Sequence, residues 1–522
     1  MIRPSDTTGG LSRPNTFRPL TISGGIRAAA GRTPDKAALG MDGRQLRYRD
    51  LVDRIDRVSN AARAGLGLTR GERVALLAPN CPELVELVCG LSAVGIAAVM
   101  VNPRLTAPEI GYICADSGAR AMLVHPALAD LARAADLPGI ERMIELGPDY
   151  EDWLAKAAAT PPEVAVEEWD VFAMHYTAGT TGEPKGVLLP HRSRALTFFG
   201  MAVEYGCYSP ADRALAIAPM FHGAGFAFAV APVFFGGYCE ILPRFDPERA
   251  LELMADCAVT NTFMVPTHFQ AVFALDEGVL NGHRTPALRT IVSNAAPLAQ
   301  ATKERIVGYF GEGILHETYG STEAGIVCNL RPEDQLRKQQ CVGLPFPCTE
   351  VRLLGDDGLD VAPGEVGELY SRSPYLFNGY WGRPEATAAA LREGWLTVGD
   401  LARRDEEGYL YIVDRKKDMI ISGGVNVYPR EIEEWLLRHS AVAEAAVIGV
   451  PDEYWGEAVQ ACVVRRPGAK VTAGQLMAHC EGHLARYKLP RAIAFVDALP
   501  RNAAGKVLKR QMRDAFNGRG AS

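Results

Sequence analysis

The amino-acid sequence predicts an α/β protein with a large N-terminal domain and a small C-terminal α+β domain. Short apolar runs alternate with helix-like stretches through most of the chain, and Gly, Pro or Asp bounds each run. The length of 522 residues exceeds that of one ordinary domain. Strands that alternate with helices over such a length predict parallel-rich sheets covered by helices on both faces.

The N-terminal elements follow from these runs in order. Residues 42–43, Asp-Gly between two apolar segments, predict a hairpin turn. Residues 82–95 predict a helix that follows a strand at 74–77. Further predicted strands lie at residues 97–101, 121–124, 171–174, 214–218 and 290–292.

The pattern changes at a charged break, residues 414–418. A strand is predicted before it, at residues 409–413. After it, helices are predicted at 431–437 and 476–484 and strands at 445–450 and 459–464. We therefore predict a flexible tail at residues 1–16, an N-terminal domain at 17–416 and a mobile C-terminal domain at 417–522.

Composition and charge exclude several classes of function. A net charge of −7 without a long basic run argues against a nucleic-acid partner. The longest apolar stretch, residues 225–238, is shorter than the ~20 residues of a membrane-spanning helix, and Pro232 interrupts it. The 11 cysteines form no Cys-x-x-Cys pair, which is typical of reduced thiols in a cytoplasmic protein.

A loop rich in glycine and threonine is the strongest local feature. It reads Tyr176-Thr177-Ala178-Gly179-Thr180-Thr181-Gly182-Glu183-Pro184-Lys185-Gly186-Val187 and follows a predicted strand. Backbone N–H groups, hydroxyls and one lysine are the donors that a polyphosphate requires. The order of residues is not that of a Walker A loop, because glycine follows Lys185 where Ser or Thr would be needed.

Further motifs follow this loop in order, and together they resemble the adenylate-forming superfamily of acyl-CoA synthetases, adenylation domains and beetle luciferases. The resemblance spans roughly residues 20–515. The motifs are Pro219-Met220-Phe221-His222-Gly223, Ser293-Asn294-Ala295-Ala296-Pro297, Tyr319-Gly320-Ser321-Thr322-Glu323-Ala324, Thr397-Val398-Gly399-Asp400, residues 414–422, and Pro500-Arg501-Asn502-Ala503-Ala504-Gly505-Lys506.

The resemblance implies a nucleotide site in which Tyr319 stacks on adenine, Thr322 contacts the α-phosphate and Asp400 and Arg415 contact the ribose. Glu323 and Thr181 would hold Mg²⁺. Without the resemblance, the Tyr319–Glu323 segment fits a helix N-cap box equally well. The full set of implied ATP and AMP contacts is Thr177, Ala178, Gly179, Thr180, Thr181, Gly182, Lys185, Asn294, Ala295, Ala296, Glu317, Thr318, Tyr319, Gly320, Thr322, Asp400, Ile412 and Arg415.

The resemblance also implies that Lys506 is catalytic, together with Thr322 and His222. Lys506 would stabilise negative charge on the α-phosphorus as pyrophosphate leaves. Lys417 matches the hinge position, about which the small domain would rotate between the two half-reactions. That rotation would bring Ser422, Gly423 and Gly424 towards the acyl-adenylate to line a narrow passage for CoA.

The segment after His222 indicates an apolar acid. Residues 223–237 carry no charge, so an α-amino acid would bury an unpaired ammonium group there. No arginine in this stretch suits a dicarboxylic acid, although Arg194 on the preceding segment could reach the site. The predicted acyl pocket comprises His222, Gly223, Phe226, Phe228, Ala295, Gly320 and Val327. It would fit a medium- or long-chain fatty acid, a bulky alicyclic acid or an aryl acid.

We therefore expect an ATP-dependent acid:CoA ligase that uses ATP, Mg²⁺ and CoA. Two alternatives stay open: an adenylating enzyme that loads an acyl carrier protein, and a non-catalytic nucleotide-binding protein. The second is disfavoured because the phosphate loop, Glu323 and Lys506 are all present. The expected partners are a small carboxylic acid, ATP and CoA, with an acyl carrier protein and a second copy of the chain as further candidates.

Overall fold

The computed structural model describes residues 18–177, 183–423, 425–452, 454–481, 483–501 and 507–517. The predicted tail at residues 1–16 lies outside them. The described chain forms two compact units. The first takes the chain up to Val351 and Ser371–Leu396, and the second takes Arg352–Tyr370 and the chain from Thr397 on. The domain boundary predicted between residues 416 and 417 stays a prediction, because the two compact units divide the chain at other positions.

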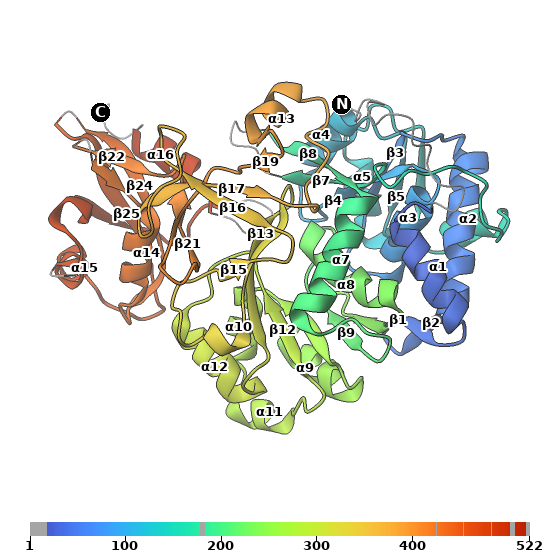
Figure 1. Cartoon of the computed structure of the whole chain (residues 1–522), viewed down its shortest axis with the longest axis horizontal. Coiled ribbons are helices and arrows are strands. Elements are labelled where there is room, and N and C mark those ends of the chain that lie inside the picture. Colours follow the sequence, from blue (N-terminus) through green and yellow to red (C-terminus); the bar gives the residue numbers. More distant parts are fainter. Residues whose placement is uncertain are drawn as a thin grey trace. The chain divides into compact units, whose positions relative to one another are not determined.

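A mixed nine-stranded sheet organises the first unit (Figure 1). Its central strands are parallel, and antiparallel strands flank them at both edges. The order across the described sheet is β15 (Leu344–Pro345), β14 (Gly325–Leu330), β13 (Leu315–Ser321), β12 (Thr290–Ser293), β11 (Asn261–Met264), β9 (Arg213–Ala216), β10 (Tyr238–Ile241), β1 (Ala37–Met41) and β2 (Arg44–Arg47).

A six-stranded sheet completes the β-structure that positions the candidate site. It is parallel except for its last pair, β7 and β8, which form an antiparallel hairpin. Its order in the described chain is β6 (Arg142–Glu145), β5 (Ala121–Val124), β3 (Arg73–Leu77), β4 (Ala97–Val101), β7 (Val171–Thr177) and β8 (Lys185–Pro190). A short pair, β18 (Leu391–Arg392) and β19 (Trp395–Leu396), lies in the same unit.

Helices cover both faces of the nine-stranded sheet because successive strand residues point to opposite faces. Phe263 of β11 stacks on Phe228 of α8, whereas Met264 joins a buried cluster with α9, α10 and α12. The helices of the first unit are α1 (Ile22–Arg32), α2 (Tyr48–Leu66), α3 (Pro82–Ser92), α4 (Ala107–Ser117), α5 (Ala129–Arg133), α6 (Pro148–Ala155), α7 (His191–Tyr205), α8 (Gly223–Phe235), α9 (Pro247–Asp256), α10 (Pro266–Val272), α11 (Glu277–Gly282), α12 (Gln300–Phe310) and α13 (Pro384–Ala390).

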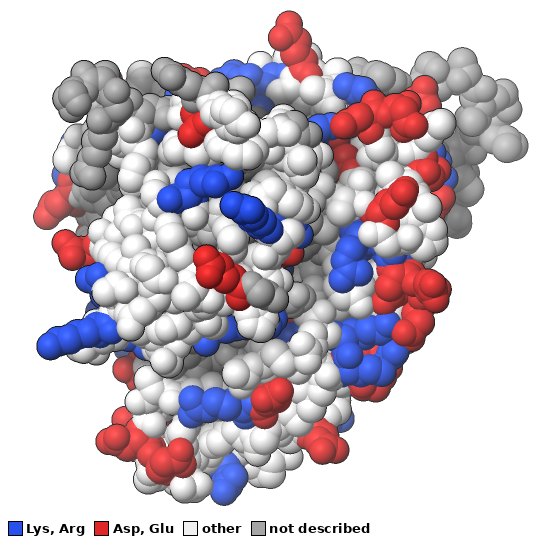
Figure 2. Space-filling model, turned by 90° about the vertical axis from the view of Figure 1, so that its left-hand side faces the viewer, with Lys and Arg blue, Asp and Glu red and all other residues white. Residues whose placement is uncertain are grey.

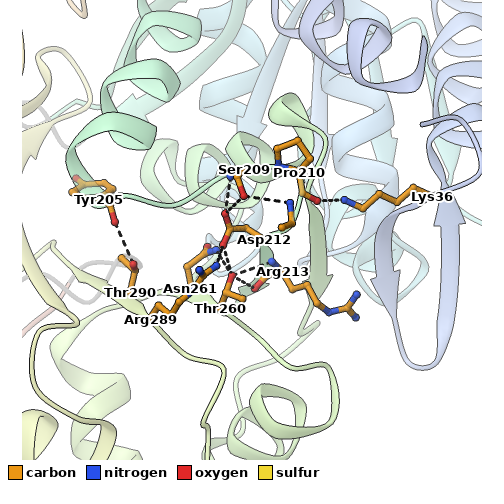
Figure 3. A network of polar contacts seen from close by, with 11 residues as sticks. Lys36, Tyr205, Ser209, Pro210, Asp212, Arg213, Thr260, Asn261, Arg289 and Thr290 are labelled. Atoms are coloured by element: carbon orange, nitrogen blue, oxygen red, sulfur yellow. Dashed lines mark hydrogen bonds and ion pairs between the residues drawn. The ribbon is translucent and has the colours of Figure 1, made fainter. Parts of the chain in front are cut away.

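A polar network joins the segments that precede β9, β11 and β12 (Figure 3). Asp212 is buried and accepts hydrogen bonds from the N–H and hydroxyl of Ser209 at 2.7 and 2.6 Å. It also accepts from the Thr260 hydroxyl at 2.8 Å and from Arg289 at 2.6 Å. Burial opposes ionisation, but these partners outweigh it and hold the pKa of Asp212 below its ordinary value. The carboxylate therefore fixes the amino ends of three parallel strands.

The second unit is α+β. A five-stranded sheet carries α14 and α15 against a buried apolar cluster, and β17 pairs with β20, which pairs with β21, in a separate antiparallel sheet. Its described elements are β16 (Glu350–Leu354) and β17 (Val366–Arg372), both shared with the first unit, β20 (Asp400–Arg404), β21 (Leu410–Arg415), β22 (Ile420–Ser422), β23 (Val425–Val427), α14 (Pro429–Leu437), β24 (Val442–Asp452), β25 (Gly456–Arg465), α15 (Ala473–Cys480), β26 (Ala492–Phe495) and α16 (Lys509–Asn517).

The predicted α/β class is confirmed. The hairpin turn is present, with Asp42 and Gly43 both at positive φ, 50° and 77°, between the antiparallel β1 and β2. The helix predicted to run to residue 484 ends earlier, at Cys480, because Glu481 has an extended ψ of 139°.

The distribution of surface charge and the hydrophobicity of the helices relate to the predictions about nucleic-acid and membrane partners. On the face shown in Figure 2, acidic and basic side chains are interspersed among uncharged residues. No helix among the described residues has both the length and the hydrophobicity that a membrane crossing requires.

Candidate active site

The glycine- and threonine-rich loop connects the two strands of the β7–β8 hairpin. β7 ends at Thr177 and β8 begins at Lys185, and these two residues stand opposite each other in the ladder. The predicted phosphate contacts between them, Ala178, Gly179, Thr180, Thr181 and Gly182, lie outside the described residues. The structure therefore places one hydroxyl and one ammonium group together at the loop end of the hairpin.

Tyr380 links this hairpin to the carboxylate predicted to hold the metal. Nζ of Lys185 lies 5.2 Å from the ring centroid of Tyr380, whose hydroxyl donates to Oε1 of Glu323 at 2.9 Å. Glu323 is buried, and within the described part of the chain its Oε2 has no hydrogen-bond donor. Burial and Glu323 raise the pKa of Tyr380 far above its ordinary value, so the phenol remains a donor. Lys185 and Glu323 thus share one neighbour.

The Tyr319–Glu323 motif ends strand β13 and begins the turn to the antiparallel β14, and it does not start a helix. The ladder between β13 and β14 shifts register at Tyr319 and Gly320. The hydroxyl of Ser321 accepts from the N–H of Ala324 at 3.0 Å and closes the turn. A Cβ atom at residue 320 would lie 2.1 Å from the carbonyl oxygen of Gly325, so the turn requires glycine there.

Arg194, on α7, holds this turn through its backbone. Its Nη2 donates to the carbonyl of Thr322 at 2.5 Å, and its Nη1 donates to that of Tyr375 at 3.4 Å. Burial lowers the pKa of Arg194 to about 10, although the charge of Glu323 opposes this, so the guanidinium is charged at neutral pH. The arginine considered for a dicarboxylic acid therefore supports the turn that carries Thr322 and Glu323.

The Ser293–Pro297 motif follows β12 directly. Nδ2 of Asn294 donates to the hydroxyl of Thr318 on the neighbouring strand at 2.9 Å. Ala295 has a φ of 78°, a left-handed conformation that is uncommon for a residue with a side chain. Ala295 and Ala296 are exposed. Two predicted nucleotide segments are therefore joined where β12 and β13 end.

Glu317 has a different set of partners from its neighbour Thr318. Its carboxylate forms an ion pair with Lys303 of α12, and its Oε1 accepts from the N–H of Leu298 at 3.3 Å. Both members of the ion pair are buried, and Lys303 has no exposed surface. Because alternate residues of a strand face opposite sides, this side chain points away from the face that carries Thr318.

His222 is the N-cap residue of α8. Solvent reaches its ring, yet protein atoms surround it on most sides, and this burial lowers its pKa to about 4 with help from Arg104. The ring is therefore neutral at pH 7, and with so low a pKa it is only a weak base, which suits a polar contact better than general-base catalysis. The segment before it is held by His175, whose Nδ1 donates to the carbonyl of Phe221 at 3.0 Å.

The two phenylalanines predicted for the acyl pocket lie on opposite sides of α8. Phe226 packs on Phe172 of β7 with ring centroids 6.4 Å apart, whereas Phe228 stacks on Phe263 at 4.2 Å. Residues two apart on a helix point in nearly opposite directions, so only one of them can line a given pocket. Of these two, Phe228 lies on the side of β11.

The other predicted acyl residues lie near the turn. A Cβ atom at Gly223 would lie 3.9 Å from the Thr322 methyl group, which places Gly223 beside the turn. Val327 is buried on β14, and Asn329, two residues further, reaches towards α7. Val327 is the residue of β14 that the register shift leaves without a partner on β13, between Ile326 and Cys328.

The second unit carries the predicted ribose contacts. Asp400 and Arg415 are directly opposed on β20 and β21, with Nε of Arg415 3.2 Å from Oδ1 of Asp400. Ile412 pairs with Ala402 on the same two strands. Asp414 is buried and accepts from the N–H of Arg430 at 2.9 Å. The charged break at residues 414–418 is therefore tied to α14 through Asp414.

The predicted hinge and CoA residues follow in the same unit. Lys417 is exposed, Ser422 is buried at the end of β22, and Gly424 and the catalytic candidate Lys506 lie outside the described residues. Gly423 has a φ of 59°, and its N–H donates to the carbonyl of Trp455 at 2.8 Å. A Cβ atom there would lie 2.8 Å from the indole, so glycine is required.

Sequence reasoning missed the residues that support the motifs from a distance. Tyr380 and His175 belong to no motif and become neighbours of the site only through folding. Asn80 is buried and accepts the N–H of Met220 at 2.7 Å. The one signal in the sequence for such a supporting role is the position of Asn80 shortly after the strand predicted at residues 74–77, because asparagine readily bonds to backbone groups.

Comparison with known proteins gives a consistent result. A family model described as "AMP-binding enzyme" matches residues 26–381, and one described as "AMP-binding enzyme C-terminal domain" matches residues 431–506. A feruloyl-CoA synthase from Amycolatopsis sp. is 38% identical over 93% of this chain and 96% of its own length. A fatty acid–[acyl-carrier-protein] ligase, ScoC from Streptomyces coeruleorubidus, is 34% identical over 93% of this chain and 94% of its own. The ATP-bound structure of MatB from Rhodopseudomonas palustris superposes with a TM-score of 0.87 at 31% identity, covering 96% of this chain and 99% of that one.

Proposed function

The chain belongs to the AMP-binding enzyme family, and on this premise we propose that it is an ATP-dependent acid:CoA ligase. In the first half-reaction a carboxylate oxygen of the acid attacks the α-phosphorus of ATP, and pyrophosphate leaves with the electrons of the broken P–O bond. In the second, the thiolate of CoA attacks the acyl carbonyl carbon, and AMP leaves as the thioester forms.

The observation that carries this proposal is the group formed by Lys185, Tyr380 and Glu323. A lysine at the mouth of a glycine-rich hairpin and a buried carboxylate share one tyrosine, through a 5.2 Å contact and a 2.9 Å hydrogen bond. The ammonium group suits the β- and γ-phosphates of ATP. Thr322, next to Glu323, supplies a hydroxyl for the α-phosphate, and Tyr319 a ring for adenine.

Glu323 fits the Mg²⁺ ion that accompanies ATP. Carboxylate oxygens are the ligands that Mg²⁺ prefers, and Oε2 accepts no hydrogen bond from the described residues. Thr181 is the second proposed ligand. When bound, the ion would neutralise charge on the phosphate oxygens. Tyr380 holds Oε1 and so sets the orientation of the carboxylate.

The second unit supplies the remaining proposed groups. Asp400 and Arg415, adjacent on paired strands, would bind the ribose hydroxyls. Lys506 would stabilise charge on the pentavalent phosphorus in the first half-reaction. For the second, Ser422 and Gly423 would line the CoA passage after rotation about Lys417.

The acid is proposed to be hydrophobic, because the candidate pocket residues other than His222 are apolar and α8 carries no charge. Relatives named for a feruloyl and for a fatty-acid substrate support this range. CoA is the proposed acceptor. The carrier-protein alternative rests on the relative named as a fatty acid–[acyl-carrier-protein] ligase.

A screen for pyrophosphate release tests the proposal. The full chain is incubated with ATP, Mg²⁺ and fatty, aryl, alicyclic or dicarboxylic acids, with and without CoA. We expect acid-dependent pyrophosphate release and, with CoA, a thioester and AMP. A thioester that forms only on a phosphopantetheinylated carrier protein would replace CoA as the acceptor, and no release with any acid would overturn the proposal.

A further inference from the structure

Tyr205, the last residue of α7, lies among aromatic side chains. Its ring stacks on Phe228 at 6.3 Å and packs on His316 at 5.1 Å and on Phe346 at 6.0 Å. Its backbone carbonyl accepts from the Thr290 hydroxyl at 3.3 Å, as Figure 3 shows. Only 4% of the residue is exposed. Three rings therefore hold the Tyr205 ring in place.

The hydroxyl of Tyr205 has no hydrogen-bond partner within the described residues. The Thr318 hydroxyl is near enough to lower the pKa of Tyr205 slightly, but the two make no bond of normal geometry. Burial dominates and raises that pKa far above its ordinary value, so the phenol is a neutral donor. A buried tyrosine hydroxyl usually has a partner, since an unpaired one costs about 1–3 kcal/mol.

A second unpaired polar atom shares a neighbour with this hydroxyl. The carboxamide of Asn329 contacts Nδ1 of His316 at 3.1 Å, and its Oδ1 has no donor in the described part of the chain. Burial lowers the pKa of His316 to about 4, so the imidazole is neutral. One donor, the Tyr205 hydroxyl, and one acceptor, Oδ1 of Asn329, therefore belong to residues that contact His316 and have no hydrogen-bond partner among the described residues.

These atoms border the proposed acyl site. Tyr205 touches Phe228, which is a proposed acyl residue. Thr318 lies two residues before Gly320 on β13 and accepts from Asn294, which precedes Ala295. On the side of β11 the rings are apolar: Phe228 and Phe263 lie parallel, with an interplanar angle of 2°. The Tyr205 hydroxyl is thus a polar hydrogen-bond donor beside the flat apolar rings of Phe228 and Phe263.

We propose that the acid is an aromatic carboxylic acid with an oxygen substituent on its ring, and that Tyr205 donates a hydrogen bond to this oxygen. The inference rests on the proposed ligase function. A flat ring suits the aromatic wall, and its oxygen pairs the hydroxyl, which an alkyl chain would leave unpaired. A site built to bind a substrate hydroxyl discriminates strongly against the analogue that lacks it.

A matched pair of acids and one substitution test this inference. The kcat/KM for adenylation, from pyrophosphate release, is compared for 3-phenylpropenoic acid, its 4-hydroxy derivative and octanoic acid. We expect the full-length enzyme to prefer the 4-hydroxy acid by at least about tenfold. Tyr205→Phe keeps the ring contacts, so it should remove this preference and leave the unsubstituted acid within about twofold of the parent value. Tyr208→Phe, at a buried tyrosine three residues further on, is the control and should keep the preference.

The outcomes separate the two proposals. Equal loss on both aromatic acids in Tyr205→Phe, or a parent enzyme that prefers octanoic or unsubstituted acid, overturns the role of Tyr205 while adenylation stands. The acid pair tests the preference on the parent enzyme alone, whether or not the variant folds. No pyrophosphate release with any acid overturns the ligase proposal, and this inference with it.

Discussion

The parallel strands of the nine-stranded sheet all begin at one end of the sheet, here called the amino edge, and all finish at the opposite end, the carboxyl edge. These two ends of the strands are built differently. At the amino edge, Asp212, Thr260 and Arg289 satisfy one another in a closed network (Figure 3). At the carboxyl edge, Ala295 has a left-handed φ of 78° and β13 shifts register at Gly320. The first edge fixes the strands, and this allows the second to hold strained and incompletely paired groups, as ligand sites in such sheets do.

The strongest test of this difference is Glu323→Gln at the carboxyl edge. It removes the charge proposed to hold Mg²⁺ but keeps an oxygen for Tyr380. We expect pyrophosphate release to fall about 100-fold or more. The free energy of unfolding should change by only about 1 kcal/mol or less, because glutamine keeps the shape of the buried side chain and its hydrogen bond with Tyr380. Glu333→Gln, at an exposed glutamate, is the control, and a loss below about tenfold would contradict the assigned role.

Gly320→Ala should disturb both activity and stability, because the new Cβ would lie 2.1 Å from a backbone oxygen. The strands must move apart or the turn must change, at about 1–3 kcal/mol of unfolding free energy. Urea unfolding and pyrophosphate release measure the two effects. Gly308→Ala in α12 meets nothing within 4 Å and should be neutral or slightly stabilising. Similar results for both variants would show that the turn tolerates a side chain.

Asp212→Asn at the amino edge should lower stability by about 1–3 kcal/mol and leave kcat of the folded enzyme unchanged. The pKa of Asp212 is lowered in the fold. Its contribution is therefore present above the unfolded pKa, about 3.9, and is lost as pH falls through the lower folded value. Unfolding measured between pH 3 and 7 should show that the variant differs from the parent least at the acid end. A kcat effect larger than the stability effect would mean that the edges are coupled.

The smallest effect is expected for the titration of His222. With a pKa of about 4, the imidazole stays neutral from pH 6 to 8. The rate of adenylation should therefore show no inflection from this group, and His222→Gln should have a profile of the same shape. An inflection near pH 6.5 that the variant loses would restore a general-base role at this edge.

Local patterns predicted much of the fold. The strands predicted at residues 97–101 and 121–124 coincide with β4 and β5, because buried parallel strands read as short apolar runs. The helix predicted to residue 484 was too long, since its end depends on the backbone of Glu481 and not on periodicity.

The site was predictable only where its residues are consecutive in the chain. The partners Tyr380 and Arg194 are distant in sequence, and no spacing rule connects them to Glu323 or Thr322. Predicting both Phe226 and Phe228 for one pocket overlooked the 3.6-residue period of a helix, which was available from the sequence. The hydroxyl of Tyr205 could not be singled out, because its lack of a partner is a property of the packed structure.

The ion pair between Lys303 and Glu317 also limits how this protein can change over generations. Loss of either partner would leave a buried charge uncompensated, at about 3–5 kcal/mol, whereas joint replacement by apolar residues would cost little. A lineage therefore cannot readily pass through the single substitutions. Residues 303 and 317 should therefore covary among the descendants of this protein.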